Sequence, residues 1–173
     1  MAWRYSAKMK NKYLFIGLIV SMVLVSCTNK EQNFDLDASV KRLQENGWTI
    51  DGEIKDKEGL EKTTYYMTQF YINEGVDLYV QTIEYYLSLC GPGTLPPEDP
   101  NWTAPYEIEF IIFSSIEDAN KYYSYFVDKS EKAKQVEGHQ LKGIYLGIND
   151  KTYIQTNSKE ASELVNGIAF YEM

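Results

Sequence analysis

The side chains that most often perform chemistry in proteins are scarce in this sequence. It contains a single histidine, His139, and two cysteines, Cys27 and Cys90, among 173 residues. A nucleophile activated by histidine could arise only if one Ser, Cys or Asp met His139 through tertiary folding. A zinc site of the usual composition would need several carboxylates in addition. We therefore expect no catalytic residue, no metal site and no cofactor, and we expect Cys90, at the end of an apolar run, to be a buried and unreactive thiol.

The 25 acidic residues offer the remaining route to acid–base or metal chemistry. Two acidic turns, 51–53 and 56–59, place carboxylates close together, but they lack the alternating ligands and the terminal Glu of an EF-hand loop. No glycine-rich phosphate loop, GxSxG motif or dinucleotide fingerprint occurs. A carboxylate pair for glycoside hydrolysis has no sequence spacing of its own, because the two groups meet only in the folded chain. A carboxylate-dependent hydrolase therefore stays open as an alternative without a sequence signal.

Tyrosine is the abundant side chain with a polar group, at 15 residues. Three pairs of adjacent tyrosines are expected to turn one ring toward a core and the other elsewhere: 65–66, 85–86 and 122–123. With Trp102, the exposed rings could form a platform for a sugar, a peptide or a protein, because rigid amphipathic rings give contact area at little entropic cost. Our candidate binding residues are Tyr66, Tyr85, Tyr86 and Trp102. The alternative is that tyrosine serves as a large core residue with its hydroxyl at the rim.

Cys27 stands directly after an apolar segment and before a polar one. Four basic residues and no acids precede the apolar segment, which runs unbroken from Tyr13 to Val25. This order is typical of a secretory signal peptide. As a helix the segment would be about 20 Å long, shorter than the roughly 30 Å hydrocarbon core of a bilayer, which disfavours a transmembrane helix. Met1 and Met9 are both compatible with the start of such a peptide.

The residues Leu24-Val25-Ser26-Cys27 resemble the lipobox of bacterial lipoproteins, in which an aliphatic residue and small residues precede an invariant cysteine. The resemblance covers residues 1–27 only. It implies that signal peptidase II cleaves between Ser26 and Cys27, that residues 1–26 are removed, and that the Cys27 thiol carries a diacylglyceryl group. Two acyl chains anchor a protein stably, at about 0.8 kcal/mol per buried methylene. We therefore expect a lipid-anchored protein on the extracytoplasmic side of the cell membrane, in the outer leaflet of the cytoplasmic membrane or, in a diderm, in the periplasm.

Charge restricts the partners of the mature chain. Loss of residues 1–26 would remove four positive charges and no acid, so the formal net charge would change from −8 to about −12. Such a surface repels nucleic acid and anionic lipid, so we expect no nucleic-acid partner and assign membrane attachment to the anchor. Residues 27–34 are expected to form the lipidated N-terminus and a polar tether, and residues 35–173 a single domain.

Periodicity predicts the elements in the first half of this domain. Leu36, Val40 and Leu43 belong to a helix with Asp35 or Asp37 as N-cap and Asn46-Gly47 at its end. A strand follows in 48–54, and 57–72 is expected to form a second helix, with a strand as the alternative. A long strand with a bulge or bend is expected in 76–89. All five prolines lie in the loop 90–105. That loop is either a connection between two strands or a recognition loop with Trp102 at its tip.

The second half contains a strand, an amphipathic helix, a β-hairpin and a short last helix, in the ranges 106–115, 116–127, 139–156 and 157–168. Ser114 and Glu117 predict a capping box for the amphipathic helix. Asn149-Asp150 predicts the tight turn of the hairpin.

This order of elements predicts an α+β domain, a two-layer sandwich with a mainly antiparallel sheet and helices on one face, ferredoxin-like or a variant of it. The small size, the lack of a catalytic motif and the tyrosines favour a lipid-anchored binding or accessory module of the bacterial cell envelope, whose ligand the sequence does not identify. The alternative is an envelope protein that acts by protein contact, as an inhibitor, an immunity factor or an assembly factor.

Overall fold

The computed structural model of the protein describes residues 34–93, 106–135 and 143–173. The helices in these stretches are α2 (Leu36–Glu45), α3 (Lys57–Asn73), α4 (Ile116–Lys134) and α5 (Lys159–Leu164). The strands are β1 (Thr49–Ile54), β2 (Ile83–Cys90), β3 (Glu107–Phe113), β4 (Tyr145–Asn149), β5 (Thr152–Thr156) and β6 (Tyr171–Glu172). None of the described helices is long and apolar enough to cross a bilayer.

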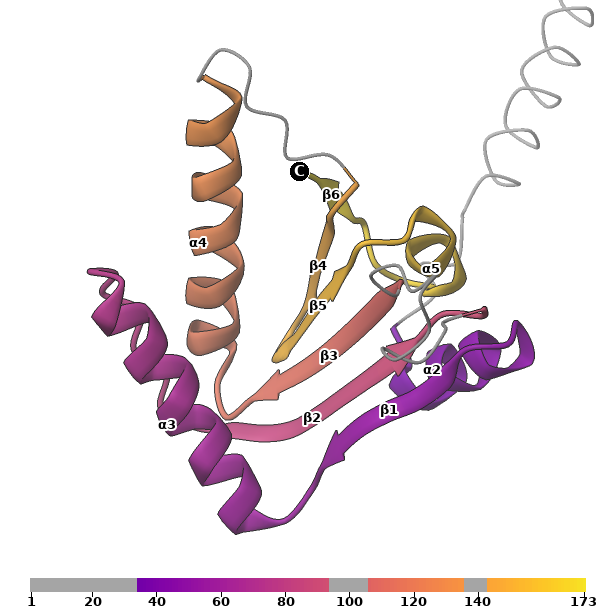
Figure 1. Cartoon of the computed structure of the whole chain (residues 1–173), viewed down its shortest axis with the longest axis horizontal. Helices are drawn as coiled ribbons and strands as arrows, with labels where there is room; N and C mark the ends of the chain where they lie inside the picture. The colour runs from indigo at the N-terminus through magenta and orange to yellow at the C-terminus, as the bar shows by residue number, and fades with distance from the viewer. Residues whose placement is uncertain (1–33, 94–105, 136–142) are drawn as a thin grey trace, which may run out of the picture. The chain divides into compact units, whose positions relative to one another are not determined.

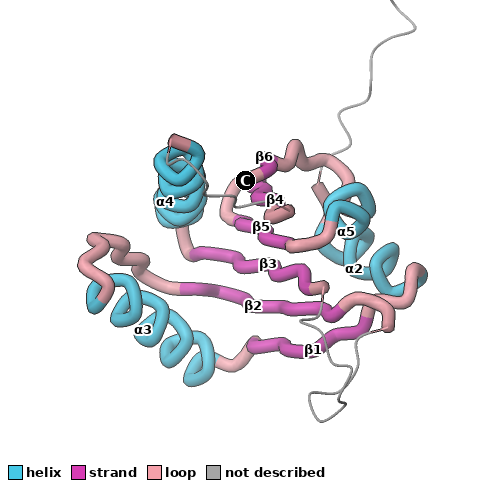
Figure 2. The backbone as a smooth tube through the Cα atoms, turned by 45° about the horizontal axis from the view of Figure 1, so that its top comes forward, coloured by secondary structure: helices cyan, strands magenta, loops and turns pink. Residues whose placement is uncertain are grey.

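The strands of the described stretches form one antiparallel sheet in the order β1-β2-β3-β5-β4-β6 (Figure 2). The predicted α+β class with an antiparallel sheet is therefore confirmed. β3 and β4 run in the same direction with β5 between them, because each is antiparallel to β5. With α4 as the connection they form a split β-α-β unit, as in ferredoxin-like folds. The β1-α3-β2 segment does not repeat this unit, since β1 and β2 pair directly with each other.

Both faces of the sheet are buried, as the apolar residues of β3 show. Ile108 and Phe110 pack with residues of α2 and α5 in one core, whereas Ile111 and Phe113 pack with residues of α3 and α4 in another. We call these the α2–α5 core and the α3–α4 core. Because alternate residues of a strand point to opposite faces, the two helix pairs lie on opposite faces of the sheet. The expected placement of all helices on one face is corrected accordingly; Figure 1 shows the two pairs at opposite ends of the strands as well.

The first helix begins and ends as its sequence predicts. The Asp35 side chain accepts a hydrogen bond from the Ala38 N–H (3.0 Å) at the start of α2. At its end the N–H of Gly47, with φ of 86°, donates to the Gln44 carbonyl, and the Trp48 N–H donates to the Leu43 carbonyl. This pair of bonds is a Schellman motif, which glycine favours because it tolerates positive φ. The motif places Trp48 directly before β1, where its side chain is buried.

The start of α4 lies one residue later than the capping box predicts. Ser115, not Ser114, is the N-cap, and its Oγ accepts a hydrogen bond from the Asp118 N–H (3.0 Å). The Ser114 N–H donates to the Thr82 carbonyl (2.8 Å). The Ser114 N–H is therefore bonded outside the helix, and the extended N-cap residue Ser115 precedes α4.

Residues 76–82 are not a strand, contrary to the prediction of one long strand over 76–89. β1 ends opposite Tyr86 and β3 ends opposite Ile83, so neither neighbouring strand continues beside these residues. The chain turns at Gly75, which has φ of 75°, and the Val76 N–H donates to the Tyr71 carbonyl of α3 (2.8 Å). The segment 76–82 therefore runs beside α3 and joins it to the sheet. The predicted bulge is present in β2 between Ile83 and Tyr85.

Replacing Phe110 by alanine should destabilise the domain strongly. The ring is fully buried in the α2–α5 core, so its loss should lower the free energy of unfolding by about 3–5 kcal/mol. Urea titration followed by circular dichroism measures this. The matched control, Ile116→Ala, changes an exposed apolar residue and should alter the value by no more than about 0.5 kcal/mol. Equal effects of the two substitutions would contradict the described core.

Candidate functional site

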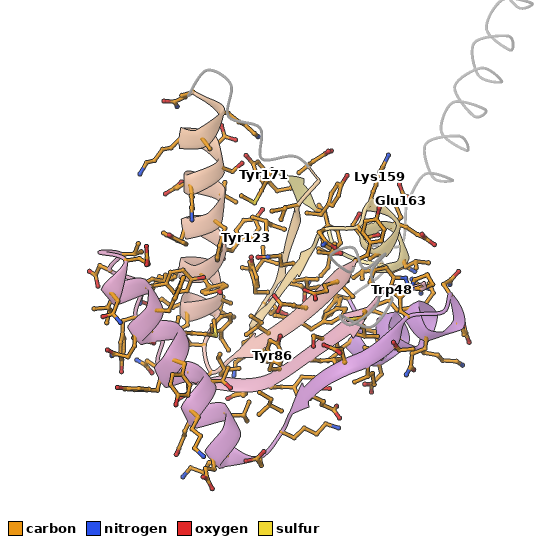
Figure 3. The ribbon with its side chains drawn as sticks, viewed as in Figure 1. Trp48, Tyr86, Tyr123, Lys159, Glu163 and Tyr171 are labelled. Carbon is orange, nitrogen blue, oxygen red and sulfur yellow. The ribbon has the colours of Figure 1, made fainter. Side chains whose placement is uncertain are left out.

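Two of the predicted binding residues, Tyr85 and Tyr86, are adjacent on β2 but point to opposite faces of the sheet. Tyr85 packs against the α2–α5 core and donates a hydrogen bond to Oε1 of Glu53 (2.6 Å). Tyr86, labelled in Figure 3, packs against the α3–α4 core and donates to Oε1 of Glu109 (2.7 Å). Burial is the main cause that raises the pKa of both phenols, and the neighbouring carboxylate raises it further. The two rings are held as protonated donors and do not form one platform.

Tyr66, the third candidate, lies on the exposed side of α3. It is 67% exposed, and its ring meets that of Tyr65 edge to face with 5.7 Å between the centroids. The remaining predicted site residues, Ser26, Cys27 and Trp102, lie outside the described residues, as do His139 and residues 94–105 of the proline-rich loop. The structure thus places Tyr66 beside Tyr65, away from Tyr85.

A groove between α3 and the segment 76–82 contains two exposed tyrosines. Its volume is about 240 Å³. The side chains that line it are those of Glu61, Thr64, Tyr65, Thr68, Gln69, Tyr79, Val80, Gln81 and Thr82. Tyr65 is 61% exposed and Tyr79 is 59% exposed. We call this surface the α3 groove and take it as the candidate binding site.

One wall of the α3 groove is a regular helix. Glu61, Tyr65 and Gln69 are spaced by four residues along α3 and therefore form one row on its surface. Thr64 and Thr68 form the adjacent row, which is buried against the rest of the domain. The helix thus presents amide, carboxylate and phenol groups to the groove above a buried pair of threonines.

The other wall is the segment 76–82, which alternates buried and exposed side chains. Leu78 and Val80 are buried in the α3–α4 core, and Tyr79 between them is exposed. The segment is tied to α3 at its end, because the Ile83 N–H donates to Oγ1 of Thr64 (3.0 Å). Two anchored apolar side chains therefore hold the Tyr79 ring at the surface. Tyr79 was not predicted as a site residue, although the alternation of Val76 to Val80 is visible in the sequence.

Thr68 carries a polar group that the fold leaves unused. The residue is only 6% exposed, and its hydroxyl has no hydrogen-bond partner among the described residues. By contrast, the hydroxyl of Thr64, one turn earlier, donates to the Leu60 carbonyl (2.8 Å) and accepts from Ile83. Buried hydroxyl groups are nearly always paired, so an unpaired one in the lining of a groove is unusual.

The charge of the α3 groove is small. Glu61 is the charged residue of its lining, and its carboxylate lies 3.6 Å from the ammonium group of Lys57 in an exposed ion pair. A single carboxylate does not provide the facing pair that glycoside hydrolysis requires. The lining contains no histidine or cysteine to form a nucleophile and base. The arrangement suits reversible binding.

A second hollow, of about 450 Å³, lies near Trp48 and Lys159 at the other end of the sheet (Figure 3). The Trp48 indole N–H is buried and has no hydrogen-bond partner within the described stretches. Lys159 lies 3.8 Å from Glu163 at the rim. Tyr106, which also lines this hollow, directly follows residues that the structure does not describe. The lining of the α3 groove, in contrast, lies well within one described stretch.

The described residues contain little else that could react. No group of three His, Cys, Asp or Glu side chains in these stretches is placed to hold a metal ion. Cys90 is half-buried, and burial raises the pKa of its thiol, with the negative charges of Asp51 and Glu107 adding to the effect. The thiol is therefore protonated at neutral pH and a weak nucleophile.

Comparison of the chain with protein-family models, with curated proteins and with solved structures finds no match. The function is consequently argued from the geometry and chemistry of the site.

Replacing Thr68 by valine should stabilise the protein. The change puts a methyl group in place of a buried hydroxyl without a partner, so the free energy of unfolding should rise by about 1 kcal/mol in urea titration. The matched control is Thr64→Val, which removes the acceptor of the buried Ile83 N–H and should lower that free energy by about 1–3 kcal/mol. A loss of stability in Thr68→Val would mean that its hydroxyl has a bonding partner.

Proposed function

We propose that this protein is a lipid-anchored binding or accessory module on the extracytoplasmic side of a bacterial cell membrane, and that the α3 groove holds its ligand. The observation that carries the proposal is the pair of tyrosine rings, Tyr65 and Tyr79, each more than half exposed on the walls of one groove. Exposed aromatic rings around a concave surface are a common feature of binding sites.

The proposed anchor is a diacylglyceryl group on Cys27, as the resemblance of residues 24–27 to a lipobox implies. Residues 27–34 would then form a tether of up to about 25 Å, at about 3.3 Å per residue. Phe34, the first described residue, packs against the α2–α5 core, on the face of the sheet opposite to α3. A tether attached there leaves the α3 groove free to meet ligands.

An envelope protein that acts by protein contact is the second candidate, and the surface of α3 favours it. Tyr66, Phe70 and Ile72 are exposed large side chains on this helix. Aromatic residues of this kind are enriched at protein interfaces. They lie outside the lining of the groove, so the two candidate functions use different residues.

The anchor is tested by Cys27→Ser in the full chain. Loss of the thiol removes the site of acylation, so we expect no incorporation of radiolabelled palmitate and no cleavage by signal peptidase II. The matched control is Cys90→Ser, which should be labelled and cleaved normally. Labelling of the Cys27→Ser chain equal to that of the unchanged chain would refute the anchor.

The binding site is tested by photocross-linking in cells. A photoreactive p-benzoylphenylalanine at position 79 should form a cross-linked product with an envelope component, because that side chain stands on the wall of the groove. The same residue at position 116, exposed at the start of α4, is the control and should give no product. Products at positions 66 and 70 but not at 79 would favour the protein-contact function. No product at 66, 70 or 79 would contradict both.

A further inference from the structure

We infer that the ligand of the α3 groove is a neutral carbohydrate chain. The inference rests on the proposed function, since it names the class of ligand for the same site. Three properties of the groove carry it: its charge, the balance of polar and apolar groups in its lining, and the exposure of its two rings.

Charge disfavours an anionic ligand. The lining contains no Lys, Arg or His, and its charged residue is the acid Glu61. The Lys57 ammonium group nearby is paired with that same carboxylate (3.6 Å). The rest of the mature chain would carry a formal net charge of about −12. Phosphorylated, sulfated or uronic-acid chains would meet repulsion without a compensating cation.

The lining combines apolar surface with hydrogen-bonding groups, and a purely apolar ligand would leave those groups without partners. Val80 is its one aliphatic residue, and the remaining members of the lining all carry a hydroxyl, amide, carboxylate or phenol group. Gln69 and Gln81 each offer a donor and an acceptor, from opposite walls. A ligand that fits must itself present several hydrogen-bonding groups of both kinds.

Extended peptides are usually recognised in a different way, by strand addition at a free sheet edge or by apolar side-chain pockets. The groove offers no apolar pocket, since Val80 is buried in the core. At the end of the segment 76–82 two backbone donors are already used. The Gln81 N–H donates to Oδ2 of Asp118 (3.1 Å), and the Ile83 N–H donates to Thr64. A peptide strand would therefore find few main-chain partners there.

A neutral sugar matches both features of the groove. Its hydroxyl groups donate and accept hydrogen bonds, and the C–H faces of its rings are apolar. The Tyr65 and Tyr79 rings, 61% and 59% exposed, provide apolar faces on the two walls. Rings and hydroxyls together are what a pyranose chain requires.

The test is calorimetric titration of the full-length, lipidated protein in a detergent without sugar groups. The probes are neutral cello-, malto-, xylo-, manno- and chito-oligosaccharides, with oligogalacturonate as the anionic counterpart. We expect at least one neutral oligosaccharide to bind and oligogalacturonate not to bind. Tyr79→Ala and Gln69→Ala should each weaken the binding about tenfold. Tyr79→Phe, which keeps the ring face, should retain affinity within about twofold.

The matched control is Tyr106→Ala. Tyr106 is 61% exposed, as Tyr65 is, but it does not line the groove, so the affinity should be unchanged. Equal weakening by Tyr106→Ala would overturn the assignment of the ligand to the groove. If no neutral oligosaccharide binds while the cross-link at position 79 persists, the binding function stands and the carbohydrate class is overturned. If both the titration and the cross-link fail, the proposed function fails with it.

Discussion

The two-sided burial of β3 is the constraint on which the rest of the fold depends. Phe110 and Ile111 are consecutive, so their side chains enter cores on opposite faces of the sheet. A strand in an antiparallel sheet with one solvent-exposed face has polar residues at every second position. β3 instead contains the unbroken apolar run Phe110 to Phe113. A strand of this kind can be stable only if helices cover both of its faces. The separation of the α2–α5 pair from the α3–α4 pair follows from that requirement.

This constraint also creates the groove. α3 must lie over Ile83 and Phe113 on one face, yet the strand that follows it, β2, must pair with β1 and β3. The chain therefore needs a connection that runs back beside α3 to the start of β2, and the segment 76–82 is that connection. Leu78 and Val80 bury the connection in the core, and the residues between them face outward. The α3 groove is the seam between the helix and its own connection, so its shape is set by core packing rather than by a loop.

Local chemistry made much of the fold predictable. The ends of α2, the extent of α3 and the β4–β5 hairpin follow from capping residues, periodicity and turn residues, which act over a few positions. The errors involve partners that are distant in sequence. Residues 76–82 have strand-like composition but no neighbouring strand, and the Ser114 N–H is bonded to the carbonyl of the distant Thr82. The short β6 at the C-terminus has too few residues to show any period, and it exists because it pairs with β4.

The sequence indicated the type of residue in the candidate site, tyrosine, but not which tyrosines form it. The abundance of tyrosine indicates exposed rings, but the prediction of one core-facing ring in each pair is wrong for 65–66, whose rings are both exposed. The pair 85–86 packs one ring against each core. Which rings share a surface depends on the tertiary fold. Tyr85 and Tyr86 are separated by the sheet, whereas Tyr65 and Tyr79 are fourteen positions apart and line one groove. The unpaired hydroxyl of Thr68 has no sequence signal, since Thr64, one turn earlier on the same helix, is fully bonded.

The size of the groove bears on how an anchored module of this kind would work. At about 240 Å³ it is smaller than the roughly 300–1,000 Å³ of typical small-molecule pockets, so one site should bind weakly. A polymeric ligand could be held more strongly than one site allows, because its repeating units can occupy the grooves of several modules held on one membrane. Linked binding of that kind can strengthen attachment by about 10²–10⁴ without a new contact. On the proposed function, the lipid anchor therefore contributes to affinity as well as to location, and a shallow groove of ring faces and hydrogen-bonding groups is sufficient.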